Sequence, residues 1–452
     1  MESRRQVVSL HLGQAGVQMG SSCWELYCLE HGISPDGRLQ QQERTQTNDN
    51  SFSTFFGETP GGQYVPRVAF LDLEPSVVDK IRRGPYRGLF HPDSLLNYKE
   101  DAATNFARGF YTLGDHFIQP AMEHVRRIVE NCDSLQGFLM NHSFGGGTGS
   151  GFTSLLLRRL NDEYLKTSKI SFVIYPSPKV ATAVVEPYNA VMNTYSSMEH
   201  VNCVFILDNE ALYDRCQKQL EILRPSYVHL NRLIAQAHSE DINTWRFNYA
   251  FILDIVAFQI DCILFFRRTI PLIIICYRVI INNELSRMER NGVTDITAAC
   301  FETDNQMINC EPSSGKYMAC CLLYRGDVMP NEVQKAISKL KVRKRLEFVS
   351  WCPTGFKIGI NYQTPTTVPG GDLAKVDRSV CLLANTTALV DAWARVNYKF
   401  DLMFSKRAFV HWFVGEGLEE GEMMVAREDL AALETDYREI HQDTFEADDD
   451  PW

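Results

Sequence analysis

The chain has 452 residues, of which 45% are hydrophobic and 22% charged, a balance typical of a globular protein long enough for about three domains. Its formal net charge of −11 disfavours a nucleic-acid partner, and because no apolar segment follows the basic start MESRR, we expect no secretory signal peptide. The thirteen cysteines form no CxxC pair and no Cys/His cluster, so they predict reduced thiols in the cytosol rather than a zinc site.

The first predicted unit is a strand, a glycine turn and a helix. Residues Val7–Leu12 alternate as a strand, Gly13–Gly16 form the turn, and Val17–His31 carry apolar side chains suited to a helix. A glycine turn at this junction brings backbone N–H groups close to a ligand. A second such unit in the same domain would predict a parallel sheet with its ligand at the carboxyl ends of the strands.

A further strand is predicted over Arg67–Leu73, and two carboxylates lie at its end. Alternate residues of a strand point to the same side, so Asp72 and Glu74 project together and could hold Mg²⁺ directly or through water. Taken alone, a solvated strand end or a helix cap is the simpler interpretation. Asp101 is predicted to open the helix Ala102–Tyr111 as its N-cap, and it reaches a phosphate only if these loops converge.

The stretch Gly137–Gly151, GFLMNHSFGGGTGSG, is the strongest motif in the chain. It predicts a buried strand over Gly137–Ser143, a glycine loop over Gly145–Gly149 and a helix from Phe152 onward. Five glycines lie within seven residues between strand and helix, which favours a phosphate held by backbone N–H groups over a merely flexible turn. The loop is neither a Walker loop nor a GxGxxG fingerprint.

The alternation of strands and helices continues as far as Ala237. Strands are predicted over Lys169–Tyr175 and Val201–Leu207, and helices over Thr182–Asn189 and Tyr227–Ala237. Asn209 and Asn231 would ordinarily be a turn residue and a helix-surface residue. An amide can also bind the edge of a purine, and Tyr227 could stack on its ring.

The pattern changes after Ala237. The segment Ile255–Ile281 is rich in Ile, Leu and Phe, but charged residues and a proline interrupt it, so we expect buried strands, or a buried helix followed by strands, and no membrane-spanning helix. Residues 209–386 are predicted to form a second, mixed α/β domain, with strands over Lys316–Tyr324, Lys357–Tyr362 and Ser379–Leu383 and a helix over Asn331–Leu340.

Two long helices are predicted to close the chain, over Asn385–Phe404 and Glu416–Ile440. The second carries one apolar stripe at helical spacing, formed by Met423, Ala426, Leu430, Leu433, Tyr437 and Ile440. Its acidic residues lie largely outside the stripe and continue into an acidic tail over Asp443–Asp450. Such a face is usually only solvated, but it also allows a basic protein partner.

Nine motifs together resemble alpha-tubulin over about nine tenths of the chain in one register: GQAGVQMG, FLDLEPS, SFGGGTGSG, VVEPYN, DNEALY, KYMACCLLYRGDV, FVSWCPTGFKIGINYQ, PGGDLAKV and KRAFVHWFVGEG. The resemblance implies a cytoplasmic, cytoskeletal protein that binds GTP and Mg²⁺, pairs with beta-tubulin in a heterodimer and enters microtubules. It implies a Rossmann-like parallel-sheet GTPase domain (1–208), a core helix with a mixed α/β intermediate domain (209–386), and a C-terminal helical hairpin with an acidic tail (387–452). Motors and associated proteins would bind the acidic C-terminal face, with no nucleic acid and no membrane as partners.

The same resemblance assigns residues to the parts of the nucleotide. Asp72 and Glu74 would serve Mg²⁺, Thr182 and Glu186 the ribose, and Asn209, Tyr227 and Asn231 the guanine. The phosphates would be bound by Gln14, Asp101, Ser143, Gly145, Gly146, Gly147, Thr148 and Gly149.

The chain departs from the resemblance at several positions. Thr104 stands where the family has asparagine, and Ala257 stands where the family has a glutamate that assists GTP hydrolysis at the next beta subunit. The resemblance implies that the chain's own GTP is structural. Ala257 cannot orient water, and the nearby Asp254 is a poor substitute, so we expect the chain's help to hydrolysis at the partner to be impaired. Residues 260–290 lose the family pattern, and the chain ends in Trp452 instead of tyrosine.

Three other hypotheses remain open from the sequence. A regulatory or specialised subunit would cap or stabilise a lattice. A free-standing nucleotide-dependent enzyme would need a catalytic arrangement that the sequence does not offer, since His142 beside the glycine loop is better explained as a strand residue. A degenerate copy would fail to fold.

Overall fold

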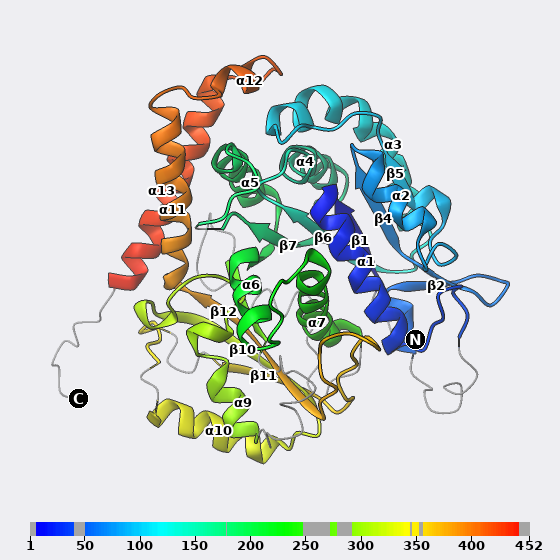
Figure 1. The fold of residues 1–452 in the computed structure, drawn as a ribbon, viewed down its shortest axis with the longest axis vertical. Helices are drawn as coiled ribbons and strands as arrows, with labels where there is room; N and C mark the ends of the chain where they lie inside the picture. The colour runs from blue at the N-terminus through cyan, green and yellow to red at the C-terminus, as the bar shows by residue number, and fades with distance from the viewer. Residues whose placement is uncertain are drawn as a thin grey trace.

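A ten-stranded sheet runs through the described part of the protein, which in this computed structural model comprises residues 6–39, 50–177, 179–246, 272–277, 292–343, 346–351 and 356–442 (Figure 1). The strand order is β11-β10-β12-β9-β8-β7-β6-β1-β4-β5. The amino-terminal strands are β1 (Gln6–Leu12), β4 (Val68–Asp72), β5 (Leu95–Asn97), β6 (Leu135–Ser143), β7 (Ser168–Tyr175) and β8 (Cys203–Asp208). A separate hairpin is formed by β2 (Phe56–Glu58) and β3 (Tyr64–Pro66).

The amino-terminal strands, from β8 to β5, are all parallel to their neighbours. Their carboxyl ends therefore lie along one edge, where ligands bind in open α/β sheets. The strands are buried on both faces: Phe138 and Met140 of β6 belong to one hydrophobic cluster and Leu139 to the other. This confirms the predicted Rossmann-like parallel sheet.

Helices cover both faces of the parallel strands (Figure 1). One layer contains α1 (Gly13–Glu30), α2 (Pro75–Arg83), α6 (Asn209–Lys218) and α7 (Tyr227–Arg246). The other contains α3 (Leu113–Glu130), α4 (Thr153–Glu163) and α5 (Glu186–His200). The site described below lies where α1, α5, α6 and α7 begin.

The carboxy-terminal half of the sheet is mixed, as predicted. Strand β9 (Leu272–Tyr277) is parallel to β8 and antiparallel to β12 (Arg378–Thr386), and β10 (Tyr317–Gly326) is antiparallel to β12 and parallel to β11 (Phe356–Asn361). Helices α9 (Val293–Ala299) and α10 (Pro330–Arg343) pack together on this half. The hydrogen-bonded sheet thus continues from β8 into β9, across the domain boundary predicted after residue 208. That domain boundary stays a prediction.

The chain ends in α11 (Val390–Phe404), the short α12 (Val410–Val414) and α13 (Glu420–Gln442), with α11 and α13 side by side (Figure 1). The predicted stripe of α13 is buried from Met423 to Tyr437, and Ile440 is partly buried. The start expected for the first helix was wrong, because Asn385 and Thr386 still pair with β10 as the end of β12.

The apolar segment Ile255–Ile281 contributes β9 to the sheet, and its other residues lie outside the described part. No helix among the described residues is long and apolar enough to cross a membrane.

Candidate nucleotide-binding site

A cavity of about 300 Å³ opens at the carboxyl ends of the parallel strands. It is lined by every residue predicted to contact the nucleotide or the metal: Gln14, Asp72, Glu74, Asp101, Ser143, Gly145, Gly146, Gly147, Thr148, Gly149, Thr182, Glu186, Asn209, Tyr227 and Asn231. These residues come from seven separate stretches of the chain, and the parallel topology brings them together. Their individual roles remain predictions.

The glycine loop between β6 and the single π-helical turn Thr148–Phe152 forms one wall of the cavity. A Cβ on Gly149 would lie 2.7 Å from the carbonyl oxygen of Ser143, so this position must stay a glycine. Within the described part of the chain, the N–H groups of Gly145 and Gly146 donate to no protein acceptor. Backbone donors of this kind at a helix start fit a phosphate anion.

The loop between β1 and α1 approaches the glycine loop closely. Gly13 has a positive φ of 69°, and a Cβ added there would lie 3.0 Å from the backbone nitrogen of Gly149. The expected four-residue turn was wrong, because this one left-handed residue lets α1 begin at Gly13. Gln14 therefore lies in the first turn of the helix, at the cavity.

Asp101 lines the cavity but does not cap a helix, which corrects the sequence prediction. Ala103 and Thr104 both have positive φ values, of 48° and 56°, so the chain cannot continue as a helix through them. The side chain of Asn105 accepts hydrogen bonds from the N–H groups of Ala107 and Arg108, at 2.9 and 3.5 Å. Asn105 is thus the residue that caps the helical segment.

Two of the cavity's carboxylates, Asp72 and Glu74, fit a bound cation. The pKa of Asp72 is raised to about 7, mainly by burial; backbone hydrogen bonds from Glu74 and Leu73 oppose this shift, and the charges of Glu74 and Asp101 add a smaller upward contribution. In the described structure the buried Oδ2 of Asp72 has no hydrogen-bond partner. A carboxylate oxygen left in this way can serve Mg²⁺.

No three Asp, Glu, His or Cys side chains among the described residues come together as a complete metal site. This agrees with Mg²⁺ chemistry in nucleotide sites, where one or two carboxylates act together with phosphate and water oxygens. Asp72 and Glu74 would then hold the ion against the phosphates.

The side of the cavity expected for the ribose is organised by Glu186. Its Oε1 accepts hydrogen bonds from the backbone N–H of Thr182 at 2.8 Å, from the Thr182 hydroxyl at 2.5 Å and from the N–H of Ala183 at 3.2 Å. The helix α5 therefore begins at Glu186 and not at Thr182, which lies in the loop held by this carboxylate. The two residues predicted for the ribose already bind each other.

The side expected for the base lies where α6 and α7 begin. Asn209 starts α6, whose N-terminus is capped by Asp208 through the N–H of Glu210 at 2.9 Å. Tyr227 starts α7 and is half exposed, with its ring 6.5 Å from that of Tyr213. Asn231 lies one turn further along α7 and also lines the cavity.

Sequence reasoning missed five residues with polar groups that line the cavity: Gln18, Tyr175, Ser177, Glu210 and Tyr213. Gln18 follows Gln14 by four residues on α1, so helical spacing could have found it. Ser177 follows β7 and donates to Asp208 at 2.5 Å, which the sequence did not indicate. Tyr213 lies one turn after Asn209 on α6, a spacing that also points toward the same cavity.

His142, the histidine beside the glycine loop, is a strand residue. His142 is buried in β6, its Nδ1 lies 2.9 Å from the carbonyl oxygen of Gly149, and burial lowers its pKa to about 4. It is therefore a packed strand residue, as the sequence suggested. Ala257 and Asp254 lie outside the described residues.

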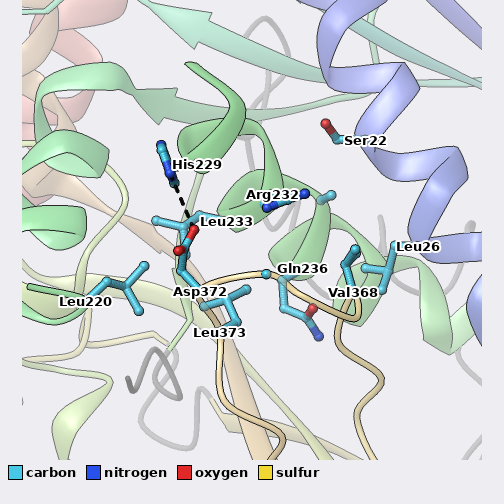
Figure 2. A pocket seen from close by; sticks show the side chains of 12 residues that line it. Ser22, Leu26, Leu220, His229, Arg232, Leu233, Gln236, Val368, Asp372 and Leu373 are labelled. Atoms are coloured by element: carbon cyan, nitrogen blue, oxygen red, sulfur yellow. Dashed lines mark ion pairs between the residues drawn. The ribbon is translucent and has the colours of Figure 1, made fainter. Parts of the chain in front are cut away.

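A much smaller cavity, of about 20 Å³, lies between α1, α7 and the loop that contains Asp372 (Figure 2). Its lining is largely apolar, including Leu26, Leu233 and Val368. The His229 ring lies over Asp372, with Nε2 to Oδ2 at 3.5 Å (Figure 2). The volume is enough for about one water molecule, so this space does not compete with the large cavity as a nucleotide site.

The parallel sheet, the glycine loop at the strand ends and the acidic pair beside it define an α/β protein that binds a nucleotide phosphate. Comparison with protein families makes this specific: residues 6–217 match the GTPase domain of the Tubulin/FtsZ family, and residues 272–398 match the tubulin C-terminal domain. The chain belongs to the tubulin superfamily, a cytoskeletal family, and its amino-terminal domain is a GTP-binding domain.

Proposed function

We propose that the chain is an alpha-type tubulin of the cytoplasm that holds GTP in the large cavity and pairs with beta-tubulin as a structural subunit of microtubules. The observation that carries this proposal is the convergence of all the predicted nucleotide and magnesium residues on one cavity. The glycine loop and the first turn of α1 would bind the phosphates. Asp72 and Glu74 would hold Mg²⁺, which neutralises phosphate charge when bound.

The surface beside the cavity supports a protein partner there. Val180 and Val184 are 62% and 68% exposed, and Leu402 of α11 is 54% exposed. A second cavity of about 200 Å³, lined mainly by apolar side chains, includes Val184 and Leu402 and shares Pro176 and Glu186 with the nucleotide cavity. Exposed apolar residues around a hollow are typical of a protein interface. A beta subunit seated here would enclose the nucleotide and keep it structural.

The alpha-type assignment is supported by the loop Pro369–Val376, which carries the sequence PGGDLAKV. Figure 2 shows Asp372 and Leu373 of this loop beside His229 and Leu233 of α7. The loop is therefore packed against the helix that also supplies the base side of the nucleotide cavity.

The acidic C-terminal face is the proposed binding surface for motors and associated proteins. Part of its charge is used internally, because Glu422 accepts from the Tyr111 hydroxyl at 2.5 Å and Glu416 from the Thr112 hydroxyl at 2.7 Å. Glu419 and Glu428 remain exposed. Exposed Met424 and Val425 lie on α13 between them, so a partner should combine basic and apolar side chains.

The test is to extract the nucleotide from the chain purified in complex with beta-tubulin. We expect guanine nucleotide, and we expect Tyr227→Ala to lower its retention on the order of tenfold, because one stacked ring contributes about 1–3 kcal/mol. Val228→Ala is the matched control, since Val228 is exposed on the same turn and does not line the cavity. A chain that carried no guanine nucleotide and formed no complex would contradict the proposal.

A second candidate function is a regulatory subunit that stabilises a lattice, and Ala257 favours it. If the partner's hydrolysis depends on a glutamate at this position, copolymers should retain GTP longer. Removing a water-orienting group costs on the order of a hundredfold in rate. Ala257→Glu should therefore speed phosphate release from the copolymer, and equal rates for both chains would exclude this candidate.

A further inference from the structure

Asn189, in the first turn of α5, is fully buried behind the nucleotide cavity and touches two of its loops. Its Nδ2 donates to the carbonyl oxygen of Thr104 at 2.6 Å and to that of Gly145 at 2.8 Å. Its Oδ1 accepts from the N–H of Phe106 at 3.1 Å. One amide thus binds the backbone of the Asp101 loop and the backbone of the glycine loop together.

We propose that Asn189 is a positioning residue of the GTP site, which fixes the Asp101 loop relative to the glycine loop. The proposal rests on the function proposed above and deepens it. Asn189 does not line the cavity, so it would act through Asp101 and Gly145, which do. Its effect would be on how firmly the bound nucleotide and its Mg²⁺ are retained.

The loop that Asn189 holds is one that would not keep its shape unaided. Ala103 and Thr104 are consecutive non-glycine residues with positive φ, a conformation that such residues rarely adopt. The Thr104 hydroxyl donates to the carbonyl oxygen of Ala103 at 2.7 Å, and the next carbonyl, that of Thr104, is the one that Asn189 binds. Without that bond the turn can relax, and Asp101, three residues before Thr104, would move with it.

The two loops are also in direct steric contact. A Cβ on Gly147 would lie 2.8 Å from both the Ala102 Cβ and the Asn105 backbone nitrogen. The glycine loop and the Asp101 loop are therefore closely packed, with no space between them for an added side chain. A shift of one loop must displace the other, and with it the N–H groups that face the phosphates.

Asn193, one turn further along α5, provides a matched control. It is also fully buried, and its Nδ2 donates to the carbonyl oxygen of Ser150 at 2.7 Å and to the Ser154 hydroxyl at 3.2 Å. Neither Ser150 nor Ser154 lines the nucleotide cavity. Replacing Asn193 therefore disturbs the same helix and a similar number of hydrogen bonds, and it reaches the cavity lining only indirectly, through the bonds of Ser150 to Gly146.

The experiment compares Asn189→Asp and Asn193→Asp in the full chain complexed with beta-tubulin. Aspartate keeps the acceptor for Phe106 but sets a carboxylate oxygen against the carbonyls of Thr104 and Gly145. We expect release of bound guanine nucleotide to become on the order of tenfold faster for Asn189→Asp and to change less than about threefold for Asn193→Asp. Asn189→Ser, which is smaller and keeps a hydroxyl donor, should fall between wild type and Asn189→Asp.

A Mg²⁺ titration separates positioning from a general loss of stability. Because Asp101 lies beside Asp72 and Glu74, the Asn189 variants should need several-fold more Mg²⁺ for half-maximal nucleotide retention, whereas Asn193→Asp should not. Equal release from both aspartate variants, or an unchanged Mg²⁺ requirement, would overturn the inference. A wild-type complex without guanine nucleotide would instead overturn the proposed function.

Discussion

Arg325 of β10 is a fully buried cation that joins the second half of the sheet to α1 and α7, two of the helices that begin at the nucleotide cavity. Its guanidinium lies 2.7 Å from Glu30 at the end of α1 and 3.6 Å from Glu240 of α7. Ser239 donates to Glu30 at 2.7 Å and Ser379 donates to Glu240 at 3.1 Å. Both helices begin at the cavity, so this ion cluster fixes their far ends against β10.

Replacing Arg325 by methionine should lower the free energy of unfolding by about 3–5 kcal/mol, because it removes a buried cation that lies beside two buried carboxylates. Exposed ion pairs contribute much less, with a median of about 0–1 kcal/mol. Arg427→Met provides the comparison, since Arg427 and Asp401 form a two-bond pair at 2.8 Å in which Asp401 is half exposed.

The assay is denaturant unfolding of the purified chain followed by circular dichroism, with both variants measured beside wild type. A triple variant, Arg325→Met with Glu30→Leu and Glu240→Leu, should recover most of the loss, because no buried carboxylate is then left without its cation. If Arg325→Met cost no more than Arg427→Met, or if the triple variant were less stable than the single one, the reasoning from burial would be refuted.

Three further predictions concern the cavity itself. Thr104→Asn should raise the free energy of unfolding by about 1 kcal/mol, because asparagine adopts the left-handed conformation more readily than a β-branched residue, and an unchanged melting temperature would contradict this. The raised pKa of Asp72 means that the folded protein without metal binds a proton at this carboxyl below about pH 7. The stability of the metal-free protein should therefore fall as pH rises from about 4 to 7, whereas its affinity for Mg²⁺ should rise with pH. Asp72→Asn should remove both trends in pH titrations. Gly149→Ala should abolish nucleotide retention because its Cβ would lie 2.7 Å from the Ser143 carbonyl oxygen, whereas Gly421→Ala, with open space around it, should leave retention unchanged when bound nucleotide is quantified.

The strands of the site could be predicted from the sequence because each is a short apolar run bounded by polar residues. Once the strands are parallel, the residues that follow them must share one edge, so Asp72, Ser143 and Asn209 come together without further information. The sequence also predicted that the second half of the chain forms a mixed α/β structure. Its continuity with the parallel half was not, because it depends on β9 pairing with β8 across a large separation in sequence.

The starts of the helices around the cavity were the least predictable part. The sequence placed helix starts at Val17, Ala102 and Thr182, but left-handed residues moved the first two, at Gly13 and at Ala103 and Thr104, and hydrogen bonds formed on folding moved the third. Thr182 is held outside α5 by two hydrogen bonds that it donates to Glu186 and by a third that Ala183 donates to the same carboxylate. The sequence cannot reveal such hydrogen bonds, because a threonine or a glutamate read on its own is an ordinary polar residue.

Asn189 shows where this limit matters most for function. It is the last residue of VVEPYN, a motif that carried the family resemblance, yet its side chain reaches neither the cavity nor the solvent. Residues that contact a nucleotide carry chemistry that the sequence displays directly, such as a carboxylate or a run of glycines. A residue that holds two loops together is recognisable only from the distances to their backbones, here 2.6 Å to Thr104 and 2.8 Å to Gly145. The firmness of the GTP site thus depends on a side chain whose role is visible only in the folded protein.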